Sequence, residues 1–197
     1  MSQRTAKLQR ETKETSITIE LSVDGSSEVN VQTGLGFFDH MVTALAFHAG
    51  WNLDLRAKGD LHVDDHQTIE DCGLLLGQAF HKALGDKLGI TRFGSKYAPL
   101  DESLARCVVD YSGRAYSVIE LGLQRDSIGD VACENLSHFF LSFASTAQIT
   151  MHLDVLRGEN DHHRAEAAFK AAALALKEAS SLTGNRSSIP STKGVLS

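Results

Sequence analysis

Apolar and polar side chains alternate along much of residues 3–31, and the spacing becomes helical soon afterwards. A two-residue period is typical of strands with one buried face, and the Asp24–Gly25 pair favours a turn, so we expect antiparallel strands here. The segment "FFDHMVTALAFHAG" (37–50) has helical spacing and ends at Gly50, a common helix stop. The next segment, "WNLDLRAKGD", has the pattern of another strand.

A longer helix is expected from Asp65 to Leu84, and the second half of the chain repeats the same order of elements. Asp65 and Asp161 stand where the long helices begin, so each either caps free backbone amides or orients a neighbouring imidazole. The elements expected in the second half are strands at 104–113 and 115–123, a short helix at 134–145, a strand at 149–158 and an alanine-rich helix from Asp161 to Ala179.

This repetition indicates an α+β fold of two duplicated halves. We divide the chain into a first half-domain (1–92), a second half-domain (93–180) and a C-terminal substrate-binding tail (181–197). The segment "GITRFGSKYAPLDES" (89–103) is expected to connect the halves. The tail phrase "IPSTKGV" combines hydroxyls, a lysine and a glycine, as a phosphate-binding loop does.

Two similar phrases carry the candidate chemistry: "DDHQTIED" (64–71) and "NDHHRAEA" (160–167). Each has a histidine and a glutamate four positions apart, which places both side chains on one helical face. His40 precedes the first phrase at nearly the distance at which His138 precedes the second. Imidazoles and carboxylates without thiolates suit manganese, iron or zinc, and the glutamates favour manganese. The sequence therefore predicts two metal ions.

Composition narrows the class of protein. The formal net charge of −6 disfavours nonspecific nucleic-acid binding, so we expect no nucleic-acid partner. No apolar run approaches the roughly 20 residues that a membrane helix needs, and the polar start of the chain lacks a signal-peptide core. We therefore expect a cytoplasmic protein without a membrane partner. The three cysteines are widely spaced among apolar neighbours and are expected to be reduced core residues.

Seven motifs together resemble one known family: "LGFFDHM", "GDLHVDDHQTIED", "TRFG", "APLDE", "LSHFF", "GENDHHRAEAAFKA" and "IPSTKGVLS". In this order and over nearly the whole chain, they resemble the single-function imidazoleglycerol-phosphate dehydratases of histidine biosynthesis. The resemblance implies two halves, each a four-stranded sheet backed by two helices. It also implies a homo-oligomer of 24 chains built from trimers, with active sites between subunits. The implied reaction is metal-dependent conversion of D-erythro-imidazole-glycerol phosphate to imidazole-acetol phosphate and water.

The resemblance further implies two Mn²⁺ ions per active site. One ion is expected to be held by His40, Gln67, Glu70 and His162, and the other by His66, His138, His163 and Glu166. The expected catalytic residue is Glu14, as general base and acid. Carried over in the same way, the residues expected to bind the phosphorylated imidazole substrate are His48, Arg92, Arg114, Lys170, Ser191 and Lys193.

One departure from the family pattern concerns Gln67, because members of the family usually carry two adjacent histidines where this chain has His66–Gln67. A neutral amide oxygen binds a metal less strongly than imidazole, so we expect the ion that Gln67 serves to be held more weakly. Two alternatives stay open at the level of sequence. One is another dinuclear-metal enzyme acting on a phosphorylated small molecule, and the other is a metal-assembled shell with weakened catalysis.

Overall fold

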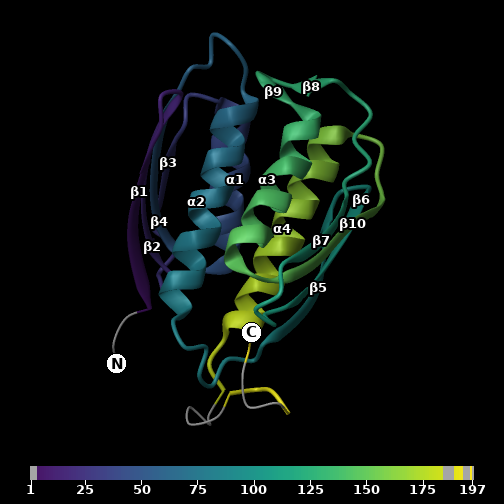
Figure 1. Cartoon of the computed structure of the whole chain (residues 1–197). Coiled ribbons are helices and arrows are strands. Elements are labelled where there is room, and N and C mark those ends of the chain that lie inside the picture. The colour runs from purple at the N-terminus through teal and green to yellow at the C-terminus, as the bar shows by residue number, and fades with distance from the viewer. Residues whose placement is uncertain (1–3, 184–188, 193–195, 197) are drawn as a thin grey trace.

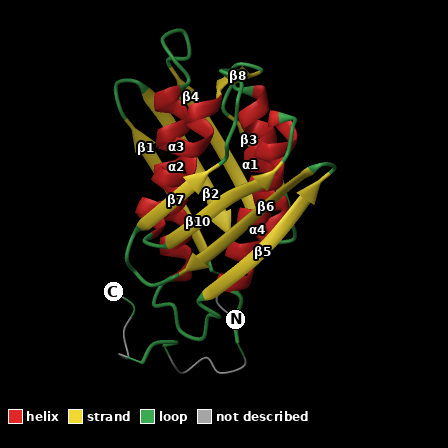
Figure 2. Ribbon diagram, turned by 90° about the vertical axis from the view of Figure 1, so that its right-hand side faces the viewer, coloured by secondary structure: helices red, strands yellow, loops and turns green. Residues whose placement is uncertain are grey.

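Four helices lie between two four-stranded sheets (Figure 1). The computed structural model describes residues 4–183, 189–192 and 196 of the chain. Figure 2 shows the second sheet crossing in front of the helices, which separate it from the first sheet. Within the described ranges, no helix combines the length and the apolar character needed to cross a bilayer.

The first half contains one sheet and two helices. Its strands follow the order β1-β2-β4-β3, in which only the β3–β4 pair is parallel. The elements are β1 (Thr5–Glu11), β2 (Thr15–Ser22), β3 (Val29–Gln32), α1 (Gly36–Ala49), β4 (Asn52–Gly59) and α2 (His66–Leu84).

The second half repeats this topology, with the order β5-β6-β10-β7 and one parallel pair, β7–β10. A small β8–β9 hairpin is inserted before its short helix. The elements are β5 (Phe93–Leu100), β6 (Ser103–Asp110), β7 (Tyr116–Glu120), β8 (Ser127–Ile128), β9 (Val131–Ala132), α3 (Cys133–Ala147), β10 (Thr150–Arg157) and α4 (Asp161–Ser180). The predicted duplicated α+β fold is therefore confirmed.

The predicted strand pairing near the start of the chain is wrong in part. Strands β1 and β2 form an antiparallel hairpin, but their turn lies at Thr12–Thr15, where the Thr12 amide donates to the Thr15 carbonyl at 2.9 Å. The turn at Asp24 and Gly25 follows β2 and leads to β3, which pairs in parallel with β4. Gly25 suits this crossing, because a Cβ there would lie 2.2 Å from the backbone nitrogen of Asn52.

The predicted connector between the halves is also wrong, because most of it forms strand β5. Its Gly94 and Pro99 weaken the sequence pattern of a strand. Both are tolerated because β5 lies at the edge of the second sheet, where it pairs only with β6. Gly94 also lies so close to α4 that a Cβ there would be 2.0 Å from the carbonyl oxygen of Ala175.

The helical layer is joined by aromatic rings from three helices. The ring centroid of Phe139 in α3 lies 5.4 Å from that of Phe38 in α1 and 5.6 Å from that of Phe169 in α4. All three side chains are fully buried, and large buried rings of this kind contribute strongly to core stability. The two short helices are thereby packed against each other and against the long helix α4.

We predict that Gly94→Ala lowers the free energy of unfolding by about 2 kcal/mol, because the added methyl group would overlap the Ala175 carbonyl. The matched control is Gly36→Ala at the start of α1, where a Cβ would meet nothing within 4 Å. Urea denaturation at one protein concentration measures both variants. An unchanged transition midpoint for Gly94→Ala would contradict the close approach of β5 and α4.

Candidate metal centres

Two groups of side chains each bring two imidazoles and one carboxylate together. The first triad consists of His66 and Glu70 from α2 and His138 from α3. In the second triad, His40 of α1 joins His162 and Glu166 of α4. Within each triad, one ligand atom from every residue lies within 4.8 Å of the other two. This spacing suits a shared divalent cation.

In the first triad, both imidazoles direct Nε2 at the same carboxylate oxygen. Oε2 of Glu70 lies 3.4 Å from Nε2 of His66 and 3.5 Å from Nε2 of His138. The two rings lie 4.7 Å apart between centroids. His66 and Glu70 are one helical turn apart, so α2 alone fixes that pair, and α3 supplies the third group.

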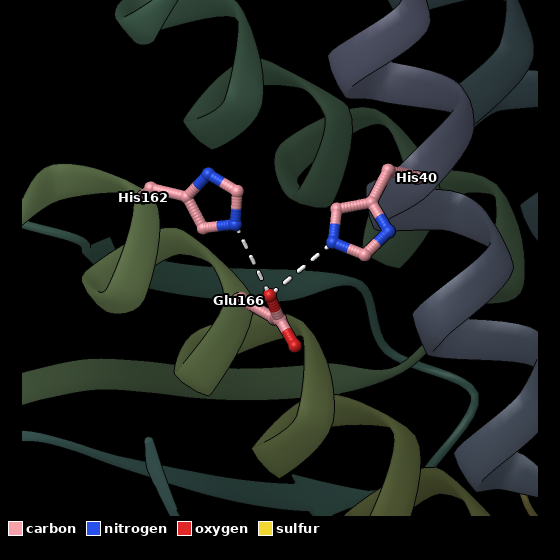
Figure 3. Close-up of side chains that lie close together, drawn as sticks. All are labelled: His40, His162 and Glu166. Atoms are coloured by element: carbon pink, nitrogen blue, oxygen red, sulfur yellow. Dashed lines mark hydrogen bonds and ion pairs between the residues drawn. The ribbon is translucent and has the colours of Figure 1, made fainter. Parts of the chain in front are cut away.

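The second triad has the same arrangement (Figure 3). Oε2 of Glu166 lies 3.2 Å from Nε2 of His40 and 3.2 Å from Nε2 of His162. The two histidines come from helices that are far apart in the sequence and meet over this carboxylate. Each triad thus takes its histidine–glutamate pair from one half and its remaining histidine from the other, so neither half forms a triad alone.

Within one chain, each glutamate lies beside the histidine of its own helix, because the four-residue spacing keeps both side chains of a phrase on one face. The expected ligand sets, which place Glu70 with His40 and His162 and Glu166 with His66 and His138, belong to a site between subunits and stay a prediction. Gln67 and His163 belong to neither triad within one chain, so their role as metal ligands stays a prediction.

The ring of His66 is oriented by a hydrogen bond with Asn135, a residue that the sequence did not single out. Nδ1 of His66 lies 2.8 Å from Oδ1 of Asn135, and Nδ2 of Asn135 donates to Oδ1 of Asp65 at 2.9 Å. Only the amide nitrogen can donate to the carboxylate, so the amide oxygen faces the imidazole and accepts its Nδ1 proton. Nε2 of His66 is then left with a lone pair for a metal. Asp65 orients the imidazole through Asn135, and it makes no side-chain cap.

The start of α4 is capped by Asn160, and the predicted capping role of Asp161 is wrong. Oδ1 of Asn160 accepts hydrogen bonds from the backbone amides of His162 and His163. Asp161 is buried, and its Oδ2 accepts from the backbone amides of Gln124 and Arg125 at 2.9 and 2.7 Å. It therefore fixes the segment that leads from β7 towards α3.

The carboxylate of the second triad also binds a lysine. Nζ of Lys170 lies 2.6 Å from Oε1 of Glu166. Burial raises the pKa of Glu166, but the hydrogen bonds from Lys170 and His40 outweigh it and bring this pKa to about 2. His48 lies nearby, and its pKa is lowered by burial and then by the positive charge of Lys170. Lys170 therefore places a cationic group directly beside the second triad.

His163 is paired with Glu102, another residue that sequence reasoning did not single out. Oε2 of Glu102 lies 2.8 Å from Nδ1 of His163, and this bond raises the pKa of His163. Oε1 of Glu102 accepts from the backbone amides of Glu159 and Asn160. The Asn160 amide is the main cause of the lowered pKa of Glu102, followed by the bond with His163. Nδ1 of His163 is thus occupied by the hydrogen bond with Glu102, and Nε2 takes no part in this bond.

Glu14 lies in the exposed turn between β1 and β2. That hairpin is tied to α2 by Asp71, which is fully buried and follows Glu70 directly. Asp71 accepts hydrogen bonds from Nε of Arg10 at 2.8 Å and from the hydroxyl of Thr15 at 2.5 Å. The position of Glu14 relative to α2 is therefore fixed by the buried carboxylate of Asp71, which accepts two hydrogen bonds from the hairpin.

The remaining residues expected to bind substrate make separate contacts in the part of the chain that the structure describes. Arg92 pairs with Asp110 at 2.7 Å and donates to the Pro190 carbonyl at 2.9 Å. Among the described residues, no hydrogen bond or ion pair connects Arg92, Arg114 and Lys170. Of the tail residues, Ser191 has its backbone amide bonded to the Ile189 carbonyl, and Lys193 lies outside the described residues.

The fold and the two triads together define a class: duplicated α+β proteins that bring imidazole and carboxylate donors together where their halves meet. Comparison with known proteins identifies the family. The family model of imidazoleglycerol-phosphate dehydratase matches residues 33–176. The dehydratase of Kluyveromyces lactis is 61% identical over 174 residues, covering 88% of this chain and 78% of the relative. That of Saccharomyces cerevisiae is 59% identical over 171 residues, covering 87% and 77%.

Solved structures agree with this assignment. The dehydratase of Staphylococcus aureus superposes with a TM-score of 0.83 at 38% identity, covering 91% of this chain and 99% of that one. The Pyrococcus furiosus structure gives 0.81 at 34% identity, covering 96% and 100%. The chain belongs to the imidazoleglycerol-phosphate dehydratase family. It is a hydro-lyase of histidine biosynthesis that acts on a phosphorylated imidazole substrate, which decides against the first alternative, another dinuclear-metal enzyme.

We predict that Glu102→Gln destabilises the metal-free protein most between pH 4.5 and 6.5, the ordinary pKa values of Glu102 and His163. Protonated His163 contributes stability below its ordinary pKa, and this is lost as the pH rises through the raised value. The Glu102 contribution is present above its ordinary pKa and is lost as the pH falls through the lowered value. Thermal unfolding across this range measures the effect, with the exposed Glu120→Gln as control. A difference from wild type that did not change with pH would count against the pair.

Proposed function

We propose that this dehydratase uses two Mn²⁺ ions per active site, one bound by His40, Gln67, Glu70 and His162 and the other by His66, His138, His163 and Glu166. The observation that carries the proposal is the convergence of two Nε2 atoms and one carboxylate oxygen within 4.8 Å, found twice in one chain. Mixed imidazole and carboxylate donors without thiolates suit manganese. The Asn135 contact adds support, because it leaves Nε2 of His66 as the metal-binding atom.

We further propose that the enzyme works as a cytoplasmic homo-oligomer, assembled from trimers into 24 chains. A three-residue triad is an incomplete ligand set for an octahedral ion, so other groups are needed. Gln67 and His163 each follow a triad histidine directly yet belong to neither triad of their own chain. Their supply to neighbouring copies accounts for this arrangement. On this proposal, Gln67 and Glu70 of one copy join His40 and His162 of another, and His163 and Glu166 likewise join His66 and His138.

Substrate binding is assigned to polar and positively charged groups. Some lie near the second triad, and others lie towards the C-terminal end of α4. Lys170 lies beside Glu166, and His48 feels the charge of Lys170. The remaining groups are expected to come together with Lys170 when chains assemble, where they anchor the phosphate. These groups are Arg92, Arg114, Ser191 and Lys193. An anchored phosphate holds the glycerol carbons in one position relative to the catalytic glutamate.

The reaction requires loss of a carbon-bound proton and of the hydroxyl on the carbon next to the ring. When bound, the metal ions supply positive charge that binds and polarises the imidazole ring of the substrate. Glu14 accepts the proton from the carbon that becomes the ketone, and the hydroxyl on the neighbouring carbon takes up a proton from solvent and leaves as water. Glu14 then gives its proton to the carbon next to the ring, while the enol hydroxyl loses its proton to solvent and becomes the ketone. The clamp of Asp71 on Arg10 and Thr15 holds the turn that carries Glu14.

The test of the cofactor is removal and replacement of the metal. We predict that dialysis against a chelator abolishes formation of imidazole-acetol phosphate from imidazole-glycerol phosphate, and that added Mn²⁺ restores it. Sedimentation velocity with and without chelator measures assembly in parallel, and circular dichroism checks that the chain stays folded. Full turnover by protein shown to be free of metal would refute the metal proposal and leave the family assignment intact.

The role of Glu14 is tested by Glu14→Gln, which keeps the size of the side chain and removes its basicity. We predict a loss of kcat of about 100-fold or more, with unchanged Mn²⁺ binding, as expected for a general base and acid. Glu11→Gln is the matched control, because Glu11 is an exposed glutamate of the same hairpin. Wild-type turnover by Glu14→Gln would show that another group moves the proton.

A further inference from the structure

We propose that Asp110 is a positioning residue, which holds the guanidinium group of Arg92 in the orientation that receives the phosphate of the substrate. The inference rests on the proposed function, because it takes Arg92 to bind that phosphate. Asp110 is the last residue of β6, and it lies opposite Phe93, the residue that follows Arg92. It acts on the substrate only through Arg92.

The guanidinium group of Arg92 is held at three points. Its Nε donates to Oδ1 of Asp110 at 2.7 Å and its Nη2 donates to Oδ2 at 3.1 Å, so this pair is bidentate. Nη1 donates to the carbonyl oxygen of Pro190 at 2.9 Å. The centroid of the Phe93 ring lies 4.7 Å from Cζ of Arg92. A flexible side chain is thereby confined to one orientation, mainly by the bidentate pair.

The contacts of Arg92 leave donors for an anion. A guanidinium group carries five N–H donors, and the bonds to Asp110 and Pro190 use three of them. No further hydrogen bond from a described residue reaches the group, so one N–H on Nη1 and one on Nη2 remain. The side chain is 17% exposed, so these donors lie close to solvent. Donors on both nitrogens match two oxygens of a phosphate.

The backbone of Arg92 is fixed as firmly as its side chain. Its φ of +74° lies in the left-handed region, which residues other than glycine rarely adopt. Its amide donates to the Ala179 carbonyl at 2.8 Å, and its carbonyl accepts from the Tyr111 amide at 3.0 Å. Strained conformations persist where neighbouring groups fix them, commonly at functional sites. The end of β6, through Asp110 and Tyr111, therefore holds both parts of Arg92.

The first half of the chain contains the same arrangement. Arg4 precedes β1 as Arg92 precedes β5. Nε of Arg4 donates to Oδ2 of Asp24 at 2.8 Å, and Nη2 donates to Oδ1 at 2.5 Å. Nη1 donates to the Ser180 carbonyl at 2.6 Å. The bidentate pair is therefore a feature of the duplicated fold, and only its second copy contains an arginine assigned to the substrate. The first copy supplies a matched control.

Asp110 also carries a negative charge, which by itself weakens the binding of an anion nearby. Its two effects on phosphate affinity therefore have opposite signs. Asp110→Asn removes the charge, but its amide nitrogen cannot accept the bond from Nη2, so Arg92 loses its fixed orientation. The loss of orientation should prevail, because the side chain of Asp110 is 22% exposed and its charge is screened by water.

The test measures KM for imidazole-glycerol phosphate and the inhibition constant Ki of inorganic phosphate, using enzyme supplied with Mn²⁺. We expect Asp110→Asn to raise both constants by about tenfold or more, with a smaller change in kcat, because the phosphate itself does not react. Asp110→Glu keeps the charge and displaces the carboxylate, so it should also raise both constants. Asp24→Asn, the matched control, should leave both unchanged.

A double-mutant cycle with Arg92→Lys separates positioning from a general effect on the fold. Lysine has no planar fork for a carboxylate to orient, so Asp110→Asn should change KM and Ki little in the Arg92→Lys background. Circular dichroism and sedimentation check the folding and assembly of every variant.

Each outcome bears on one claim. Wild-type KM and Ki in Arg92→Lys would show that Arg92 does not bind the phosphate, and the proposed substrate site would be wrong. If Arg92→Lys raises both constants while Asp110→Asn lowers them or leaves them unchanged, only the positioning role is overturned. An Asp110→Asn effect that persists undiminished in Arg92→Lys, or that Asp24→Asn reproduces, has the same consequence. Asp110→Glu, which retains the charge, decides the matter if Asp110→Asn does not fold.

Discussion

The packing of helices across the two halves is the constraint on which the candidate site depends. Helix α2 packs against α3, and α1 packs against α4, so each histidine–glutamate pair meets a histidine from the other half. The rings of Phe38, Phe139 and Phe169 fix this layer, and a sheet covers each side of it (Figure 1). Rigid helices hold ligand atoms more accurately than loops do, which suits a site that must fit a cation.

The same duplication that creates two triads also allows them to diverge. Backbone positions are matched between halves, so the differences between Asn135 and Phe37 and between Leu74 and Lys170 give the two triads different surroundings. The first triad has a buried polar chain behind it, whereas the second combines an aromatic contact with a lysine.

Much of this arrangement was accessible from the sequence, because helical spacing determines which side chains share a face. The long helices, their histidine–glutamate pairs and the duplication all follow from such local periodicity. The wrong predictions concern choices that depend on distant partners. Gly94 and Pro99 hide the strand pattern of β5, which pairs with β6. Strand β3 pairs with β4, a partner that local spacing does not indicate. Asn135 reaches His66 only because α3 packs against α2.

The segment between β7 and α3 limits which insertions and deletions the chain can accept during evolution. Asp161 holds its beginning at Gln124 and Arg125, and Asp65 holds its end at Ala132. One stretch of backbone therefore braces the origins of both long helices at once. Insertions or deletions there would displace the starts of α2 and α4 relative to each other. Relatives should therefore vary in length at other surface loops and keep the length of this segment constant.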